Sequence, residues 1–195
     1  MKSLFQVSDN GQIDFVPVFE MLNAELSKMN KPLELVCAGG YVMQLNGYRA
    51  TADVDAFYKS DDELEKVIRK VGDEFDVNKD DELWLNNSIS NMNPTPPSAY
   101  CKSVHQFSHL DVKAVDIIYL IGMKLTSARE QDLKDTADIL KHNNIEQLFE
   151  LLSKLVDMKF EIDISVLLDT FGRAYGIDWL EAFYRNNEAE ISKYY

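Results

Sequence analysis

Residues 33–58, LELVCAGGYVMQLNGYRATADVDAFY, contain the pattern that decides the fold. An apolar run at 33–38 ends at the glycine pair 39–40, and a short apolar run stopped by a breaker is typical of a buried strand. Residues 41–45 are predicted to form a short helix, and a second apolar run opens within 53–57. The stretch therefore predicts a strand, a helix and a second strand in immediate succession.

Gly39 and Gly40 are predicted to form a turn that binds phosphate. Paired glycines let the backbone turn sharply and leave N–H groups that no Cβ covers. The helix predicted after them carries partial positive charge at its N-terminus, which favours an anion. The pattern indicates that the phosphates of a nucleotide bind here.

Asp53 and Asp55 are predicted to bind a divalent metal ion. Residues two apart in a strand point to the same face, so the two carboxylates lie close together and repel each other unless a cation joins them. Oxygen ligands of this kind suit Mg²⁺, which takes the rest of its shell from water and phosphate. The glycine pair and the acid pair together predict a nucleoside triphosphate site for metal-assisted phosphoryl or nucleotidyl transfer.

This combination resembles the signature of the nucleotidyltransferases of the DNA polymerase β-like superfamily, in the form of their minimal, AbiEii-like toxin–antitoxin branch. The resemblance implies transfer of a nucleoside monophosphate from an NTP, with Mg²⁺ or Mn²⁺ as cofactor held by Asp53 and Asp55. The nucleotide-binding residues that it implies in this stretch are Gly39, Gly40, Arg49 and Thr51.

A second stretch contains residues that could act in binding or catalysis, residues 116–140, DIIYLIGMKLTSAREQDLKDTADIL. Lys124 is a cation in an apolar helical neighbourhood, so it needs an anion, either a triphosphate oxygen or an acidic side chain. On one straight helix Lys124 and Asp135 would lie about 16 Å apart. We therefore predict a break near residues 126–127 and a new helix from about Arg129, which returns Asp132 or Asp135 to Lys124.

The sequence of this stretch also resembles later motifs of the same branch, Lys-Leu followed by Arg-x-x-Asp-Leu-x-Asp. The resemblance implies that Lys124, Asp132 and Asp135 act in catalysis and that Lys124 and Arg129 bind the nucleotide. The alternative is that Arg129, Asp132 and Asp135 form ion pairs on the surface.

Other segments are predicted to support this site. Helices are expected at 13–29 and at 60–72, and the apolar spacing from 145 onward predicts further helices interrupted at Gly172 and Gly176. A strand is expected at 105–114. Its Asp111 is the acid available as a third carboxylate, and Trp84 is predicted to lie in the core rather than to stack on a base.

The fold predicted from these elements is α/β (α+β), a small mixed sheet flanked by helices with a helical C-terminal part. Residues 1–141 are expected to form the nucleotidyltransferase-like domain, and residues 142–195 a helical extension packed on it. Cys37 and Cys101 are predicted to be free thiols. No run of apolar residues is long enough for a membrane span, and a cytoplasmic location is expected.

Three functions remain open for a chain of net charge −13, which repels nucleic acid at long range. The first is nucleotide transfer to tRNA or protein, as in toxin–antitoxin systems, with a cognate antitoxin or toxin protein as a possible partner. The second is a catalytically weak or inactive protein that binds a partner. The third is transfer to a small cationic molecule of the aminoglycoside kind, which an acidic surface attracts.

Overall fold

The structure is a computed structural model that describes residues 12–79, 82–91 and 93–194. These residues form eight α-helices and one five-stranded sheet, which confirms the predicted mixed α/β class with a helical C-terminal part. Contacts divide the chain into two compact units, Met1–Asp116 and Ile117–Tyr195. This division precedes the predicted domain boundary after residue 141, which rests on the extent of the sequence resemblance and stays a prediction.

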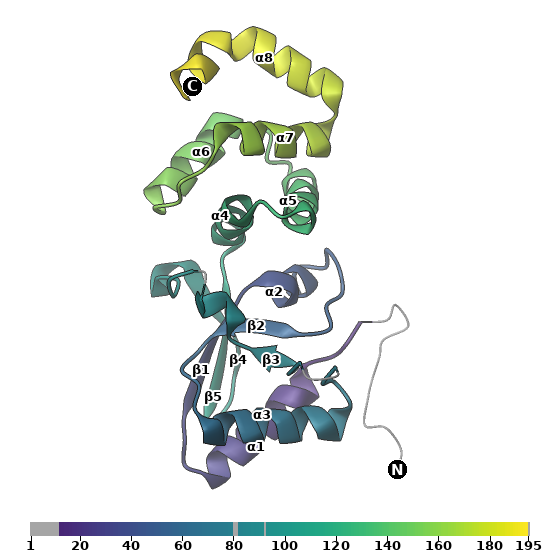
Figure 1. Cartoon of the computed structure of the whole chain (residues 1–195), viewed down its shortest axis with the longest axis vertical. Helices are drawn as coiled ribbons and strands as arrows, with labels where there is room; N and C mark the ends of the chain where they lie inside the picture. Colours follow the sequence, from purple (N-terminus) through teal and green to yellow (C-terminus); the bar gives the residue numbers. More distant parts are fainter. Residues whose placement is uncertain (1–11, 80–81, 92, 195) are drawn as a thin grey trace. The chain divides into compact units, whose positions relative to one another are not determined.

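The first unit is built on a mixed sheet (Figure 1). Its strands are β1 (Leu33–Cys37), β2 (Val54–Phe57), β3 (Leu85–Asn86), β4 (Cys101–Gln106) and β5 (Leu110–Val115), in the order β3-β2-β1-β5-β4. The central strand β1 runs antiparallel to β2 and parallel to β5. Leu35, Val36 and Cys37 are buried, as expected for the predicted central strand.

Two amphipathic helices cover one side of this sheet, α1 (Val16–Lys28) and α3 (Asp62–Phe75) (Figure 1). Both were expected from their apolar spacing, and α3 extends three residues beyond its predicted end. The side chain of Asp61 caps α3 by accepting a hydrogen bond from the backbone N–H of Leu64, 2.9 Å away. The two helices pack against each other and place Phe19, Leu22 and Ile68 in the core.

The segment predicted as one strand at 105–114 is instead an antiparallel hairpin of β4 and β5. The backbone N–H of Phe107 donates to the carbonyl of Leu110 across the turn. The alternation of polar and apolar residues continues through this short turn, so the sequence pattern resembles one uninterrupted strand. Leu110 and Val112 of β5 are buried in the core.

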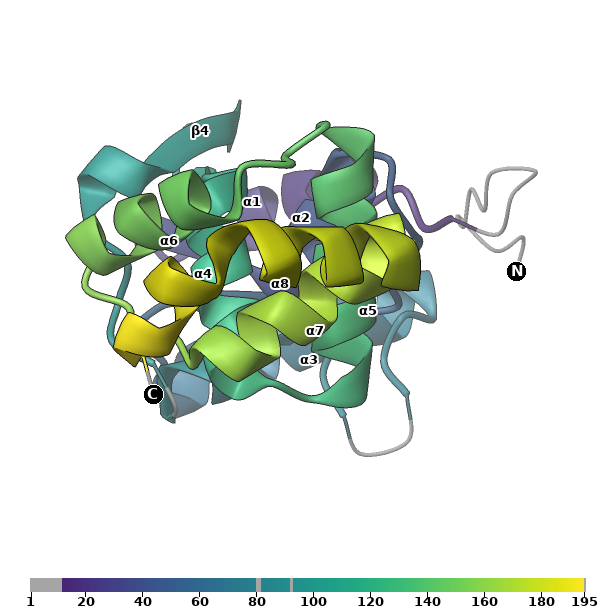
Figure 2. The same cartoon turned by 90° about the horizontal axis from the view of Figure 1, so that it is seen from above.

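The second unit is helical and consists of α4 (Ile117–Ser127), α5 (Glu130–His142), α6 (Leu148–Asp157), α7 (Ile164–Tyr175) and α8 (Ile177–Ile191). Helix α7 packs against α5 and α8, and Figure 2 shows α8 along α7. Gly176 separates α7 from α8 as predicted, but the predicted interruption at Gly172 is wrong. Gly172 lies within α7, where a Cβ would approach the side chain of Leu180 at 3.0 Å, so its role is close helix packing. None of the described helices is long and apolar enough to cross a lipid bilayer.

Candidate functional site

The glycine pair forms the start of the short helix α2 (Gly39–Leu45), which follows β1. Gly39 has φ of +57°, a conformation that glycine adopts without strain. A Cβ on Gly39 would lie 2.7 Å from Oδ2 of Asp55, and a Cβ on Gly40 would lie 2.3 Å from Oγ1 of Thr51. Both positions therefore need glycine, because the side chains of Asp55 and Thr51 occupy the space that a Cβ would need. The helix begins at Gly39 and not at Tyr41 as expected, since the glycines form its first turn.

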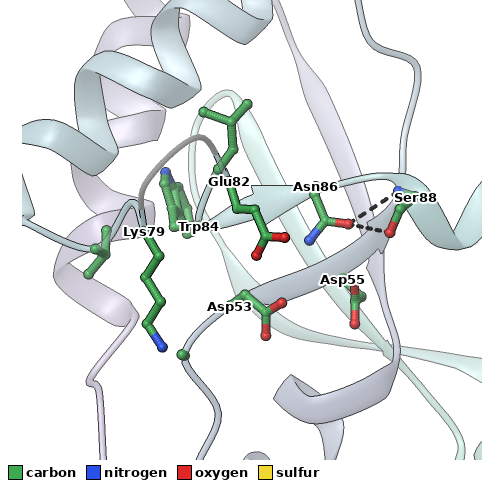
Figure 3. A pocket seen from close by; sticks show the side chains of 10 residues that line it. Asp53, Asp55, Lys79, Glu82, Trp84, Asn86 and Ser88 are labelled. Atoms are coloured by element: carbon green, nitrogen blue, oxygen red, sulfur yellow. Dashed lines mark hydrogen bonds between the residues drawn. The ribbon is translucent and has the colours of Figure 1, made fainter.

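The acid pair is arranged as the strand period predicts. Val54 is fully buried, whereas Asp53 and Asp55 are only partly buried and line the same cavity of about 410 Å³. Figure 3 shows both carboxylates at this cavity. The hydroxyl of Thr51 donates to Oδ1 of Asp53 at 3.0 Å, and the carbonyl of Asp55 accepts from the N–H of Ala38 at 3.0 Å. Four residues predicted for the site, Gly39, Thr51, Asp53 and Asp55, are thus neighbours.

The carboxylates of Asp53 and Asp55 fit Mg²⁺ or Mn²⁺ if phosphate and water oxygens supply most of the ligands of the ion. Within the described ranges, no group of three or more His, Cys, Asp and Glu side chains is placed to hold a metal ion. Two carboxylates suffice for Mg²⁺ when water and phosphate oxygens complete its shell. Because Gly39 has no Cβ, its backbone can lie close to Oδ2 of Asp55. The protein therefore offers a two-carboxylate site next to a backbone turn.

The loop that carries Arg49 and Thr51 is held by Gln44, a residue that the sequence analysis did not single out. Oε1 of Gln44 accepts from the backbone N–H of Thr51 at 3.0 Å, and its Nε2 donates to the carbonyl of Ile13 at 2.8 Å. Nη1 of Arg49 donates to the carbonyl of Ala50. Gln44 is buried although polar, and this burial is the signal that marks it as a positioning residue.

Side chains from β3 and its flanking residues form the far wall of the cavity, and sequence reasoning missed most of them. Lys79, Glu82, Asn86 and Ser88 line the cavity together with the acid pair. Strand β3 runs parallel to β2 and pairs Asn86 with Asp55. Trp84 is 1% exposed, and its indole N–H donates to the carbonyl of Ile68 at 3.0 Å, which confirms its predicted place in the core.

Asp111 does not serve as a third carboxylate beside the acid pair. It accepts hydrogen bonding from Ser103 at 2.7 Å and pairs in register with Glu34 at the start of β1. Ala38, which bonds to Asp55, lies four residues further along the chain, about 13 Å at the rise of a strand. The sequence left open whether Asp111 adds a third carboxylate, and the hairpin register places it at the other end of the sheet.

The predicted helix break is present in the second unit. Helix α4 ends at Ser127, Ala128 has φ of +51°, and α5 begins at Glu130. Nζ of Lys124 lies 2.8 Å from Oδ1 of Asp132 and 2.7 Å from Oδ2 of Asp135. The break thus returns both aspartates to the lysine, as the spacing argument required.

This cluster of Lys124, Asp132, Asp135 and Arg129 is largely internal. The side chains of Lys124 and Asp132 are each 6% exposed and that of Asp135 is 1% exposed, so the surface ion-pair alternative is wrong for both aspartates. Nε of Arg129 donates to Asp132 at 2.7 Å, although the arginine side chain is 73% exposed.

Asp132 is stabilised as an anion within the cluster. Burial acts to raise the pKa of its carboxyl, but hydrogen bonds from Arg129, Lys124 and Ser127 together outweigh burial and hold the pKa below its usual value. Asp135 also accepts from the amide of Gln131 at 2.8 Å. Two carboxylates and two basic groups therefore balance one another in charge.

Comparison with known families gives one match over most of the chain. Residues 14–180 match the model of a family described as "Nucleotidyltransferase of unknown function (DUF6036)". Comparisons with curated proteins and with solved structures gave no match. The matched range includes the glycine pair, the acid pair and the Lys124 cluster, while the AbiEii-like branch stays a prediction.

Proposed function

Because the chain belongs to this nucleotidyltransferase family, we propose that it transfers a nucleoside monophosphate from an NTP to an acceptor, with the acid pair as the catalytic centre. The observation that carries the proposal is the close approach of Gly39 to Asp55, where a Cβ would lie 2.7 Å from Oδ2. Such an approach puts a carboxylate directly beside a backbone turn. A metal ion and a phosphate group need these two features at one place.

Asp53 and Asp55 are the residues that would hold Mg²⁺ or Mn²⁺. The bound ion would neutralise charge on the triphosphate and on the leaving pyrophosphate. The hydroxyl of Thr51 keeps Asp53 in place through its 3.0 Å hydrogen bond, and Gln44 holds the backbone of Thr51. These contacts would orient the carboxylates before the nucleotide arrives, which is the form of preorganisation that catalysis uses.

The nucleotide is proposed to bind across the start of α2, with Gly39, Gly40, Arg49 and Thr51 as its contacts. The acceptor oxygen would attack the α-phosphorus in line as the bond to the pyrophosphate breaks. RNA, protein and small-molecule acceptors, and a role in a toxin–antitoxin pair, all belong to the proposal. The net charge of −13 favours a compact or cationic acceptor among them.

Roles in catalysis for Lys124, Asp132 and Asp135 stay predictions, as does nucleotide binding by Lys124 and Arg129. Lys124 already donates to two buried carboxylates, so at most one of its three N–H groups remains for a phosphate oxygen. This arrangement favours a first role in holding α4 and α5 together. Arg129 has the exposure that contact with phosphate requires.

The test is transfer of label from each of four α-labelled nucleoside triphosphates, with Mg²⁺ or Mn²⁺, to tRNA, to the protein itself and to aminoglycosides. Asp53→Ala and Asp55→Ala should abolish labelling. Asp111→Ala is the matched control, because it removes an aspartate of the same sheet that lies at its other end. Equal labelling by wild type and the two acid-pair variants would contradict the proposed function.

A further inference from the structure

The cavity beside the acid pair contains polar groups that the proposed roles of Asp53 and Asp55 leave unused. Glu82 and Asn86 line it opposite the acid pair, and Figure 3 shows the carboxylate of Glu82 and the amide of Asn86 at its interior. At about 410 Å³ the cavity is within the range of small-ligand sites. It therefore has room for a substrate group in addition to a metal ion.

Asn86 presents a donor whose direction is fixed. Its Oδ1 accepts from both the backbone N–H of Ser88 at 3.2 Å and the Ser88 hydroxyl at 2.6 Å. These two bonds assign the oxygen to Ser88 and turn the amide nitrogen Nδ2 toward the cavity (Figure 3). Because Asn86 pairs with Asp55 in the parallel ladder, this donor lies next to the acid pair.

The carboxylate of Glu82 is a hydrogen-bond acceptor, and two hydrogen bonds to Lys79 hold its backbone. Its N–H donates to the carbonyl of Lys79 at 2.8 Å, and its carbonyl accepts from the N–H of Lys79 at 3.1 Å. Among the described residues, the cavity lining carries the three carboxylates of Asp53, Asp55 and Glu82 and one ammonium group, that of Lys79. One divalent ion at the acid pair would balance the two excess negative charges. With its ion bound, the described lining has no net charge and still offers a hydrogen-bond donor and an acceptor.

We propose that this cavity binds a sugar hydroxyl between Glu82, which accepts its proton in a hydrogen bond, and Nδ2 of Asn86, which donates to its oxygen. A hydroxyl is the neutral group that both donates and accepts, so it satisfies both side chains at once. The inference rests on the proposed function, because two reaction partners could carry such a hydroxyl. It belongs either to the ribose of the NTP or to the sugar of an acceptor.

The first arm tests the NTP as the source. Calorimetry on the full chain with Mg²⁺ would compare the Kd of ATP, 2′-deoxy-ATP and 3′-deoxy-ATP. Removal of the hydroxyl held in the cavity should weaken binding by at least about tenfold, because two hydrogen bonds are lost and one of them has a charged partner. Asn86→Asp keeps the oxygen that Ser88 needs, replaces the donor with a carboxylate oxygen and adds one negative charge, so this variant should lose the discrimination.

A charge-neutral swap separates hydrogen bonding from electrostatics. Glu82→Gln combined with Asn86→Asp exchanges donor and acceptor at unchanged total charge, and it should regain at least part of the discrimination that Asn86→Asp loses. Asn87→Ala and Glu74→Gln are matched controls, because neither residue lines the cavity. Both should discriminate as the wild type does.

The second arm tests the acceptor as the source. Binding of adenosine and of 2′,3′-dideoxyadenosine would be compared in the presence of Mg²⁺ and saturating α,β-methylene-ATP. Discrimination in this arm alone, lost in Asn86→Asp, assigns the cavity to the acceptor sugar. Binding of ATP that depends on Asp53 without discrimination in either arm overturns the inference and leaves the proposed function intact. A wild type that binds no nucleotide overturns both.

Discussion

The chain contains two aspartate pairs that differ in how the fold treats their charge. Asp53 directly precedes strand β2 and Asp55 lies within it, and both are partly exposed and line an open cavity. Asp132 and Asp135 lie three residues apart on a helix, are buried, and enclose the ammonium group of Lys124. Either spacing puts two carboxylates on one face of its element.

The difference lies in the groups that surround each pair of carboxylates. Asp132 receives hydrogen bonds from a lysine, an arginine and a serine, so its negative charge is compensated within the protein. Asp53 receives a bond from the neutral hydroxyl of Thr51, which orients the carboxylate without cancelling its charge. Asp53 and Asp55 are therefore suited to binding a cation from solution. Asp132 and Asp135 are suited to holding α4 and α5 together.

The largest effect on stability is expected from removing the cation that lies between Asp132 and Asp135. Lys124→Met leaves two buried carboxylates without their cation, and this should lower the free energy of unfolding by about 3–5 kcal/mol. Denaturant unfolding of the full chain measures it. Lys134→Met is the control, because Lys134 is exposed and forms only a 3.7 Å surface pair with Glu130, worth about 1 kcal/mol or less.

If Lys124→Met does not fold, a combined variant keeps the comparison testable. Lys124→Met with Asp132→Asn and Asp135→Leu removes the three buried charges of the cluster and leaves only the exposed Arg129. Replacement of all the buried charges is far less costly than removal of one of them. The combined variant should be more stable than Lys124→Met alone. Equal stability of Lys124→Met and wild type would contradict the structural role of the cluster.

The next largest effect should come from Asp53 and Asp55, and it should fall on activity alone. Asp53→Asn is expected to lower the transfer rate by at least about a hundredfold, or about 2.7 kcal/mol in the barrier. Its free energy of unfolding should stay level or rise slightly, because one of two repelling charges is removed. Labelled transfer and denaturant unfolding on the same preparation measure both quantities. A loss of stability like that of Lys124→Met would abolish the distinction between the pairs.

A smaller effect is expected from filling the space that the glycine pair leaves open. In Gly40→Ala the new Cβ would lie 2.3 Å from Oγ1 and 2.9 Å from Cβ of Thr51. The resulting overpacking should cost about 1–3 kcal/mol of stability and disturb the hydrogen bond from Thr51 to Asp53. A thermal melt and a Mg²⁺ titration measure the two consequences.

Gly47→Ala is the control for Gly40→Ala, since a Cβ there meets nothing within 4 Å and the change tests backbone strain alone at φ of +75°. It should leave Mg²⁺ binding unchanged. Adding Thr51→Ser to Gly40→Ala retains the hydroxyl and removes one methyl group, so partial recovery of stability is expected. Full Mg²⁺ affinity in Gly40→Ala would show that the close approach is unimportant.

The smallest effect is a pH dependence that distinguishes the second pair. The pKa of Asp132 lies below its usual value in the folded protein, so the unfolded chain binds this proton first on acidification. The stabilisation is present above the ordinary carboxyl pKa of about 4 and is lost as the pH falls through the folded-state pKa. Asp132→Asn should remove part of a slope that is at most about 1.4 kcal/mol per pH unit for one proton. Urea unfolding at several acidic pH values measures it, and identical slopes would contradict the assignment.

The sequence was most informative where chemistry and local geometry coincide. The glycine pair, the acid pair and the break before Arg129 each follow from a short pattern that allows few backbone conformations. The buried Lys124 required an anion, and the helix geometry left Asp132 and Asp135 as the nearest acids. These predictions needed no knowledge of contacts between distant strands.

The features that the sequence did not predict all depend on strand pairing. The turn at residues 107–109 is hidden because the alternation continues through it. Asn86 enters the site only because β3 pairs with β2 in a register that puts it beside Asp55. Strand register also places Asp111 away from the site, because Asp111 pairs with Glu34. Pairing between distant strands is not fixed by local spacing, so these positions required the structure.

The two tryptophans of the chain divide between its two compact units, Trp84 in the first and Trp179 in the second. Trp84 is enclosed on the wall of the cavity beside the acid pair, whereas Trp179 stacks on Phe183 with the ring centroids 4.9 Å apart. Replacement of either indole by phenylalanine leaves a single tryptophan in a known unit, whose emission can be excited selectively at wavelengths that tyrosine does not absorb. The emission spectrum of each variant therefore reports the melting of one unit, and that of Trp84 also gives an optical signal for occupancy of the neighbouring cavity.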